Sequence, residues 1–385
     1  MARGAIARRT FEAALSAAAL AVAGLVVAAA FPRAAAVSPA TAAATLRRDP
    51  LDAPALRITA LASTDVGETR RTLEFLIRGS WRDGPTDAWL LRDRLARGDL
   101  TGALDCADAL LRLDATGKTR PALFDLLTKA TGFVEARPPL VARLSANPWW
   151  RQDFLRYLDV HGDPLAATLL FSDMAGGPRP VRPVEYAPLI DRLVANGNYR
   201  EAIAAWRGVT PDPARASAPL HDGDFAQAWD LTPFTWRPTT GIGAISEVGE
   251  EPGGQRRRVL RIDYDGFAAP SLPAQLLVLP VGRWRLGWRL KGDAQADQAL
   301  YWRVRCADTG AVLAGGPAAS ADTGPTLGWR PRTLTFTTPS DGCHGQWLEL
   351  TGAPGERRTQ VTAWYADFRL RPETQQQVNR AAGTG

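Results

Sequence analysis

The pattern of apolar and polar positions changes near the middle of the chain. Between residues 37 and 212, short polar turns that contain glycine interrupt the apolar residues at nearly regular intervals. After residue 222, apolar and polar residues instead alternate in short runs bounded by glycine and proline, which is typical of β-strands. These runs lie at 259–264, 275–279, 283–290, 301–306, 333–337, 346–350 and 362–370. We therefore predict a helical part at 37–212, a proline-containing linker, an antiparallel β-sandwich at 222–372 and a disordered tail at 373–385.

The helical part contains a repeated unit. The segments 98–104 and 197–203 share one design, in which glycine ends a helix and a small residue five positions later opens the next helix. Glycine permits the left-handed backbone that closes a helix, and a small side chain lets two helices approach closely. Glycines fit the same spacing at 67, 98, 132, 162 and 197, so the interval is close to 34 residues.

This stretch resembles the tetratricopeptide repeat family. In the best copy, Tyr186, Leu189, Gly197 and Ala202 occupy the aromatic, packing, turn and small positions of the family. A second copy covers residues 84–115, and the remaining copies are irregular. The resemblance implies an α-solenoid that binds a protein partner on its concave side; the alternative is a solenoid that serves only as a stalk.

Alternation assigns side chains to the two faces of each expected strand, because successive side chains point to opposite sides. In 283–290, Trp284, Leu286, Trp288 and Leu290 are expected to point inward. The outward-facing residues are expected to include Arg283, Arg285, Arg289, Tyr301, Arg303, Arg305, Trp347, Tyr365 and Arg369. If these strands belong to one sheet, its outer face carries many arginines beside aromatic rings.

The β-part resembles a carbohydrate-binding-module jelly roll of the galactose-binding-like kind. The resemblance rests on Trp229, the turn and strand at 280–286, Trp329, Phe336 and the final strand at 364–370. It implies sugar binding. Arginine forks pair with carboxylates and flat rings stack on sugars, so the outward-facing residues named above point to an acidic polysaccharide. The alternative is a solvated outer face without a ligand.

The amino terminus has the pattern of an export signal. Three arginines precede an almost wholly apolar run at 13–31, which is longer than the usual core of a cleaved signal peptide. We expect an uncleaved signal anchor at 1–36, a single-pass inner-membrane helix and a body in the periplasm. Cleavage in the alanine stretches at 28–30 or 34–36, which would give a secreted periplasmic protein, is the alternative.

Cysteine usage agrees with an oxidising compartment. Cys306 and Cys343 both lie in the β-part, and we expect them to form a disulfide; two buried free thiols are the alternative. Cys106 lies among alanine and leucine in a helical segment and is expected to be a buried apolar residue.

Charge and motifs exclude several functions. Of the net charge of +6, residues 1–48 hold +5, so the body lacks the basic surface of a nucleic-acid-binding protein. The three histidines are isolated and the chain has no C-x-x-C motif, so the sequence indicates no metal site. It also has no nucleophile elbow, phosphate loop or dinucleotide fingerprint. Glycoside hydrolysis needs two carboxylates close together, and the sequence leaves open whether Glu349 and Asp367 form such a pair.

These observations together predict a non-enzymatic, membrane-anchored accessory protein that needs no cofactor. Its sandwich would bind a polysaccharide and its helical repeats an envelope protein, in assembly of the cell envelope or an exopolysaccharide. The first alternative is a scaffold that binds only proteins, and the second is a sugar-modifying enzyme.

Overall fold

The computed structural model describes residues 38–79, 83–227, 229–230, 232–237, 242–251, 258–268, 270, 272–293, 295–317 and 328–373. The chain divides into two compact units, Met1–Pro180 and Val181–Gly385. The expected membrane segment at 13–31 and most of the expected tail at 373–385 lie outside the described residues. Among the helices that are described, none is both long and apolar enough to cross a bilayer.

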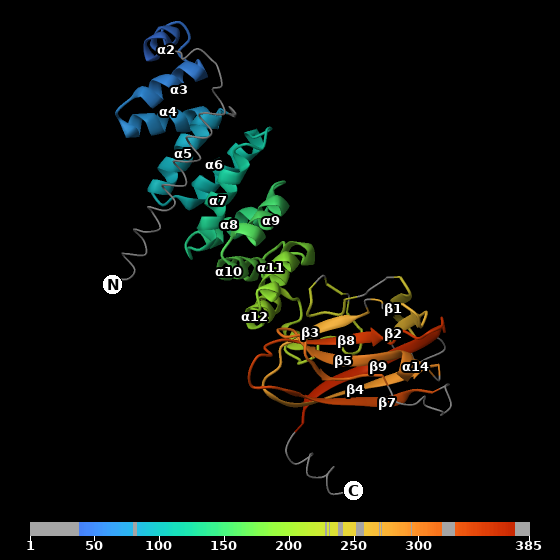
Figure 1. The fold of residues 1–385 in the computed structure, drawn as a ribbon. Helices are drawn as coiled ribbons and strands as arrows, with labels where there is room; N and C mark the ends of the chain where they lie inside the picture. The colour runs from blue at the N-terminus through green and yellow to red at the C-terminus, as the bar shows by residue number, and fades with distance from the viewer. Residues whose placement is uncertain are drawn as a thin grey trace. The chain divides into compact units, whose positions relative to one another are not determined.

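The first unit is built from helices that follow one another along the chain (Figure 1). They are α2 (Pro39–Leu46), α3 (Ala53–Ala62), α4 (Val66–Arg78), α5 (Gly84–Ala96), α6 (Leu100–Leu113), α7 (Arg120–Thr131), α8 (Arg137–Ser145), α9 (Arg151–His161) and α10 (Pro164–Ala175). Aspartates cap several of them: Asp52, Asp99 and Asp163 each accept a hydrogen bond from a backbone N–H of the first turn.

The predicted turns form at most of the repeated glycines. Gly98 and Gly197 have φ of 76°, the left-handed geometry that favours glycine, and the alanines five positions later, Ala103 and Ala202, are buried. Gly67 differs, because it lies in the first turn of α4, which Asp65 caps. The prediction that this glycine ends a helix is wrong. Membership of the helices in the tetratricopeptide class stays a prediction.

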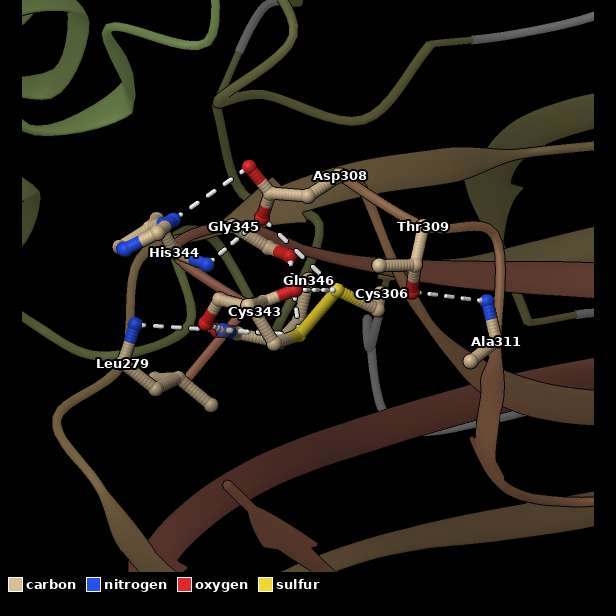
Figure 2. Close-up of a disulfide and its surroundings, with 10 residues drawn as sticks. Leu279, Cys306, Asp308, Thr309, Ala311, Cys343, His344, Gly345 and Gln346 are labelled. Atoms are coloured by element: carbon tan, nitrogen blue, oxygen red, sulfur yellow. Dashed lines mark hydrogen bonds and ion pairs between the residues drawn. A yellow bond between two sulfur atoms is a disulfide. The ribbon is translucent and has the colours of Figure 1, made fainter. Parts of the chain in front are cut away.

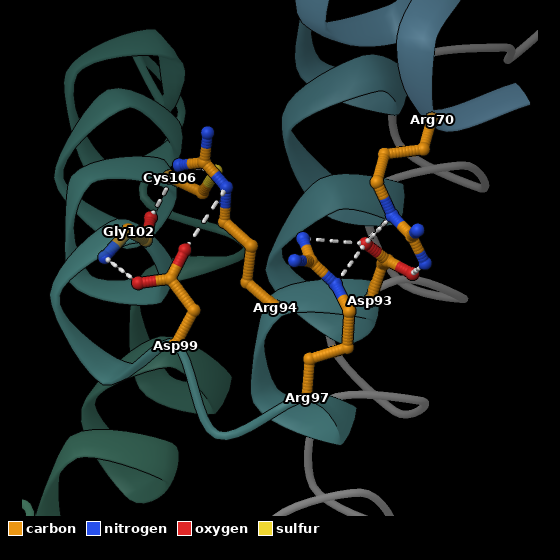
Figure 3. A network of polar contacts seen from close by, with 7 residues as sticks. All are labelled: Arg70, Asp93, Arg94, Arg97, Asp99, Gly102 and Cys106. Atoms are coloured by element: carbon orange, nitrogen blue, oxygen red, sulfur yellow. Dashed lines mark hydrogen bonds and ion pairs between the residues drawn. The ribbon is translucent and has the colours of Figure 1, made fainter. Parts of the chain in front are cut away.

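A buried carboxylate joins two neighbouring helices of the first unit, α4 and α5. Asp93 on α5 is 8% exposed and accepts hydrogen bonds from Arg70 Nε at 2.8 Å and Nη2 at 2.7 Å (Figure 3). Arg97, one turn later, donates to the same carboxylate at 3.0 Å. Burial acts to raise the pKa of Asp93, but the hydrogen bonds from the two guanidinium groups outweigh it and lower the pKa.

The second unit begins with α11 (Pro183–Ala195), α12 (Tyr199–Val209) and α13 (Pro213–Ala216), and continues with two antiparallel sheets (Figure 1). One sheet has the order β1-β2-β9-β4-β7 and the other the order β3-β8-β5-β6. The strands are β1 (Ala244–Glu250), β2 (Arg258–Tyr264), β3 (Ala274–Leu277), β4 (Gly282–Gly292), β5 (Leu300–Cys306), β6 (Val312–Ala314), β7 (Arg330–Thr338), β8 (Gln346–Gly352) and β9 (Val361–Pro372), with the short helix α14 (Ala296–Ala299) before β5.

The two sheets pack face to face around one apolar core. Trp302 of the four-stranded sheet contacts Phe368 of the five-stranded sheet, with ring centroids 4.9 Å apart. Leu286, Val304 and Leu348 are fully buried in the same core. The strand order is that of a jelly roll, and the predicted antiparallel β-sandwich is confirmed.

A β-bulge interrupts the alternation in β9. On β4, Gly287 and Arg289 are two positions apart, whereas their partners on β9, Arg369 and Ala366, are three positions apart. Asp367 is the extra residue of the bulge, and its φ is 57°. The inward-facing positions therefore change phase at Asp367.

Candidate functional site

The sandwich divides the expected arginine-rich face into two. Strands β4 and β9 belong to the five-stranded sheet, whereas β5 and β8 belong to the four-stranded sheet. The outer faces of two packed sheets point in opposite directions. The condition that all these strands share one sheet is therefore not met, and the expectation of a single arginine-aromatic face is wrong.

The alternation within β4, β5 and β8 is as predicted. Trp284, Leu286 and Leu290 are buried on β4, while Arg283 and Arg285 are exposed. On β5 and β8 the outward-facing side chains are only partly exposed: Tyr301, Arg303, Arg305, Trp347 and Glu349.

The placement of Tyr365 on an outer face is wrong. Its side chain is 1% exposed and its ring contacts Trp302 in the core, with centroids 5.6 Å apart. The bulge at Asp367 is the reason, because before it the inward-facing positions of β9 are 361, 363 and 365. Trp364 takes the outward position, opposite Lys291 of β4, and Tyr365 has no surface on which a sugar can stack.

Five outward-facing residues of β5 and β8 form a continuous strip, which we call the β5–β8 strip. The antiparallel register pairs Tyr301 with Thr351, Arg303 with Glu349 and Arg305 with Trp347. Paired residues lie on the same face, with Cβ atoms about 5 Å apart. The two rings therefore lie at opposite ends of the strip, separated along the strands by about 13 Å at about 3.3 Å per residue.

A charged group occupies the middle of the strip. Glu349 Oε1 accepts hydrogen bonds from Arg303 Nε at 2.5 Å and from Arg305 Nε at 3.1 Å. The side chains are 32%, 31% and 16% exposed for Arg303, Arg305 and Glu349. Each guanidinium thus keeps N–H groups for another acceptor, while the shared carboxylate fixes both arginines in place.

A disulfide fixes one end of the strip. Cys306 at the end of β5 is bonded to Cys343 ahead of β8, as predicted, with Cα atoms 5.4 Å apart (Figure 2). The fully buried Gln346 donates to the carbonyl of Cys343 at 3.0 Å and accepts from the N–H of Leu279 at 3.1 Å. These bonds hold the register that places Trp347 opposite Arg305.

The outer face of the five-stranded sheet holds the other predicted arginines. Arg283, Arg285 and Arg289 lie on β4 and Arg369 lies on β9. Two cations of this face, Arg371 and Lys291, were missed, because the expected strands ended at 370 and 290. Glu373 was also missed: nothing in the local sequence shows that it pairs with Arg283 and Arg285.

The structure does not bring together the carboxylates considered for hydrolysis. Glu349 lies on the four-stranded sheet and Asp367 on the five-stranded sheet, on opposite outer faces. Among the described residues, one cluster has cysteine and carboxylate atoms close enough for a metal ion: Cys306, Asp308 and Cys343. The two cysteines are bonded to each other, so their sulfur atoms are not free thiolate ligands.

No protein-family model matches the chain, and no curated protein matches it. Among solved structures, one described as CBM4 is 17% identical, with 40% of this chain and 99% of that chain covered and a TM-score of 0.31. The CBM22-1 xylan-binding domain of Xyn10C from Paenibacillus barcinonensis is 15% identical over 36% and 85%, with a TM-score of 0.27. TmCBM61 in complex with β-1,4-galactotriose is 18% identical over 39% and 92%, with a TM-score of 0.26.

Proposed function

We propose that the protein binds a polysaccharide through the β5–β8 strip. The observation that carries the proposal is the arrangement of Tyr301 and Trp347 at opposite ends of a strip whose middle holds Arg303, Glu349 and Arg305. Rings at both ends offer flat apolar surfaces to two sugars of one chain. The charged group between them offers hydrogen-bond donors and acceptors to the hydroxyl groups of the sugars in between.

The geometry of the strip is suited to a polymeric ligand that consists of many repeating units. A short strip with two stacking surfaces gives modest affinity for one segment, and repeated segments along a polymer raise the apparent affinity through effective concentration. The Arg303–Glu349–Arg305 group is already positioned before binding, which reduces the entropy lost on binding. A binding role therefore fits the strip better than catalysis.

We further propose that the protein acts outside the cytoplasm, held at the membrane by residues 13–31, as an accessory protein of envelope or exopolysaccharide assembly. The Cys306–Cys343 disulfide supports an oxidising compartment. The helical unit is proposed to contact an envelope protein.

Affinity electrophoresis of the full-length chain in gels containing xylan or β-1,4-galactan, both neutral polysaccharides, tests the proposal. We expect retardation by at least one neutral polysaccharide. Trp347→Ala and Tyr301→Ala should each weaken that binding about tenfold, which corresponds to about 1.4 kcal/mol.

Trp149→Ala is the matched control, because Trp149 lies in the helical unit and is 53% exposed. It removes the same side chain and should leave binding of the neutral polysaccharide unchanged. No retardation by either neutral polysaccharide, or equal retardation of wild type and Trp347→Ala in those gels, overturns the proposed function.

A further inference from the structure

We propose that the outer face of the five-stranded sheet is a second, separate binding site, which takes an anionic polysaccharide through its carboxylate groups. Its cations come from two neighbouring strands, and we call them the β4–β9 arginine row: Arg283, Arg285, Arg289 and Lys291 on β4, and Arg369 and Arg371 on β9. This site goes beyond the proposed function, because it lies on the opposite side of the sandwich from the β5–β8 strip.

The register aligns the row along the sheet. Arg285 lies directly opposite Arg371, and Gly287 directly opposite Arg369, while Arg283 and Arg289 extend the row toward both ends of β4. From Arg283 to Lys291 the row is about 26 Å long at about 3.3 Å per residue. A row of this length matches several repeat units of an extended polymer better than a small anion.

One end of the row already holds a carboxylate. Glu373 Oε2 lies 2.6 Å from Arg283 Nε, and Glu373 Oε1 accepts hydrogen bonds from Arg285 Nε at 3.0 Å and Nη2 at 2.5 Å. Two N–H groups of Arg285 thus bind one carboxylate oxygen, through charge-assisted hydrogen bonds that are stronger than neutral ones. Both arginine side chains are still about half exposed, at 50% and 49%.

The middle of the row is open. Arg369 and Arg371 are exposed, and neither has an ion pair with a residue that the structure describes. Gly287 presents no side chain beside Arg369, so a ligand group can approach this guanidinium from the β4 side. On β7, Thr335 and Thr333 lie opposite Arg285 and Gly287 and add exposed hydroxyl groups to the same face.

The chemistry favours a carboxylate-bearing polymer over other polyanions. The anions already seated in the row are carboxylates: Glu373 lies at one end, and at the other end Asp367 lies 3.9 Å from Arg289 and Glu251 lies 3.2 Å from Lys291. The aromatic side chains of Trp329 and Trp364 near that other end offer flat surfaces to sugar rings. Arg289 lies over the ring of Trp329 at 5.8 Å, and Lys291 over that of Trp364 at 5.9 Å. Outside residues 1–48 the chain carries a net charge of only +1, which disfavours nucleic acid as the ligand.

Two binding faces on opposite sides of one sandwich would allow the protein to bind two polymer chains at the same time. A neutral chain held on the β5–β8 strip and an acidic chain held on the β4–β9 arginine row do not compete for space. The sandwich would then join two polymers, or two segments of one polymer whose composition varies along its length.

The test measures the binding of polygalacturonate to the full-length chain as a function of salt concentration. We expect Arg369→Ala combined with Arg371→Ala to weaken binding at least about tenfold and to reduce its salt dependence. The matched control is Arg357→Ala with Arg358→Ala, which removes the same charge from an exposed loop of the sandwich and should have little effect. Binding of a neutral polysaccharide should be unchanged in both double variants.

A second variant tests the role of Glu373. Glu373→Gln removes the internal carboxylate from Arg283 and Arg285, and we expect it to tighten binding of polygalacturonate several-fold, whereas Glu247→Gln on the edge strand β1 should not. No binding of polygalacturonate, or equal loss in the two arginine variants, overturns the second site and leaves the proposed function standing. Equal binding of duplex DNA or of phosphatidylglycerol vesicles through Arg369 and Arg371 overturns its assignment to carboxylates.

Discussion

The indole Nε1 of Trp206 donates a hydrogen bond to the carboxylate of Asp230 at 2.9 Å. The same carboxylate accepts from the hydroxyl of Tyr186 at 3.2 Å and from the hydroxyl of Thr235 at 2.9 Å. Trp206 lies on α12 and Tyr186 on α11, and both are buried, whereas Asp230 belongs to the segment that leads into the sandwich. One carboxylate therefore joins the last helical hairpin to the β-part of the second unit.

Asp230→Ala should loosen this connection. It leaves the buried Trp206 N–H and Tyr186 hydroxyl without their acceptor, at a cost of about 1–3 kcal/mol in the free energy of unfolding of the second unit. Hydrogen exchange should show faster exchange in α11 and α12. Asp191→Asn is the control, because the Asp191–Arg237 pair at 2.7 Å is exposed and should contribute little. Equal exchange rates in Asp230→Ala and wild type contradict the prediction.

The disulfide should contribute substantially to the stability of the sandwich. Its two cysteines are 37 residues apart, and closing a loop of that length in the unfolded chain stabilises the folded state by about 4 kcal/mol. Denaturant unfolding of Cys306→Ala with Cys343→Ala should show this loss. A reducing agent should lower the stability of the wild type and leave the double variant unaffected; a reductant-insensitive wild type argues against the bond.

Asp87 should make the helical unit less stable as the pH rises. Burial, with a contribution from the neighbouring Asp83, raises the pKa of Asp87 to about 7. Since the unfolded value is about 3.9, the free energy of unfolding should fall as the pH rises from about 4 to about 7, by about 4 kcal/mol, and level off above that. Asp87→Asn should remove this fall in the free energy of unfolding, which hydrogen exchange at each pH measures. Asp125→Asn should retain the fall, because the side chain of Asp125 is about half exposed.

Tyr365→Phe should leave the sandwich as stable as the wild type, or slightly more stable. The hydroxyl of Tyr365 is buried and has no hydrogen-bond partner among the described residues, and burial raises its pKa. Removing an unpaired buried hydroxyl recovers its desolvation cost, about 1 kcal/mol or less. Thermal unfolding measures the change, and polysaccharide binding should be unchanged. A marked loss of stability or of binding would show that the hydroxyl has a partner after all.

The sequence pattern was sufficient where the relevant information is local. Alternation along β4, β5 and β8 assigned Arg285, Arg303 and Trp347 to outer faces, because each of these strands keeps its phase through the positions concerned. Gly98 and Gly197 were placed in helix-closing turns for the same reason, since a left-handed residue is set by its own turn.

The pattern failed where distant parts of the chain decide the outcome. Which strands share a sheet depends on pairing across long stretches of chain, so the separation of Arg285 from Arg303 had no local signal. The bulge that turned Tyr365 inward depends on how β9 fits against β4. Glu373 reaches Arg283 and Arg285 only because the end of β9 lies beside the beginning of β4.

The bulge at Asp367 also sets a limit on changes in chain length. Deleting Asp367 alone would place Tyr365 and Phe368 two positions apart, so both would still point inward and β9 would pair with β4 without a bulge. Deleting both Ala366 and Asp367 would make Tyr365 and Phe368 neighbours in the chain, and alternation would then turn one of them outward. Homologues that keep this sandwich should therefore tolerate the loss of one residue at this point of β9 but not of two.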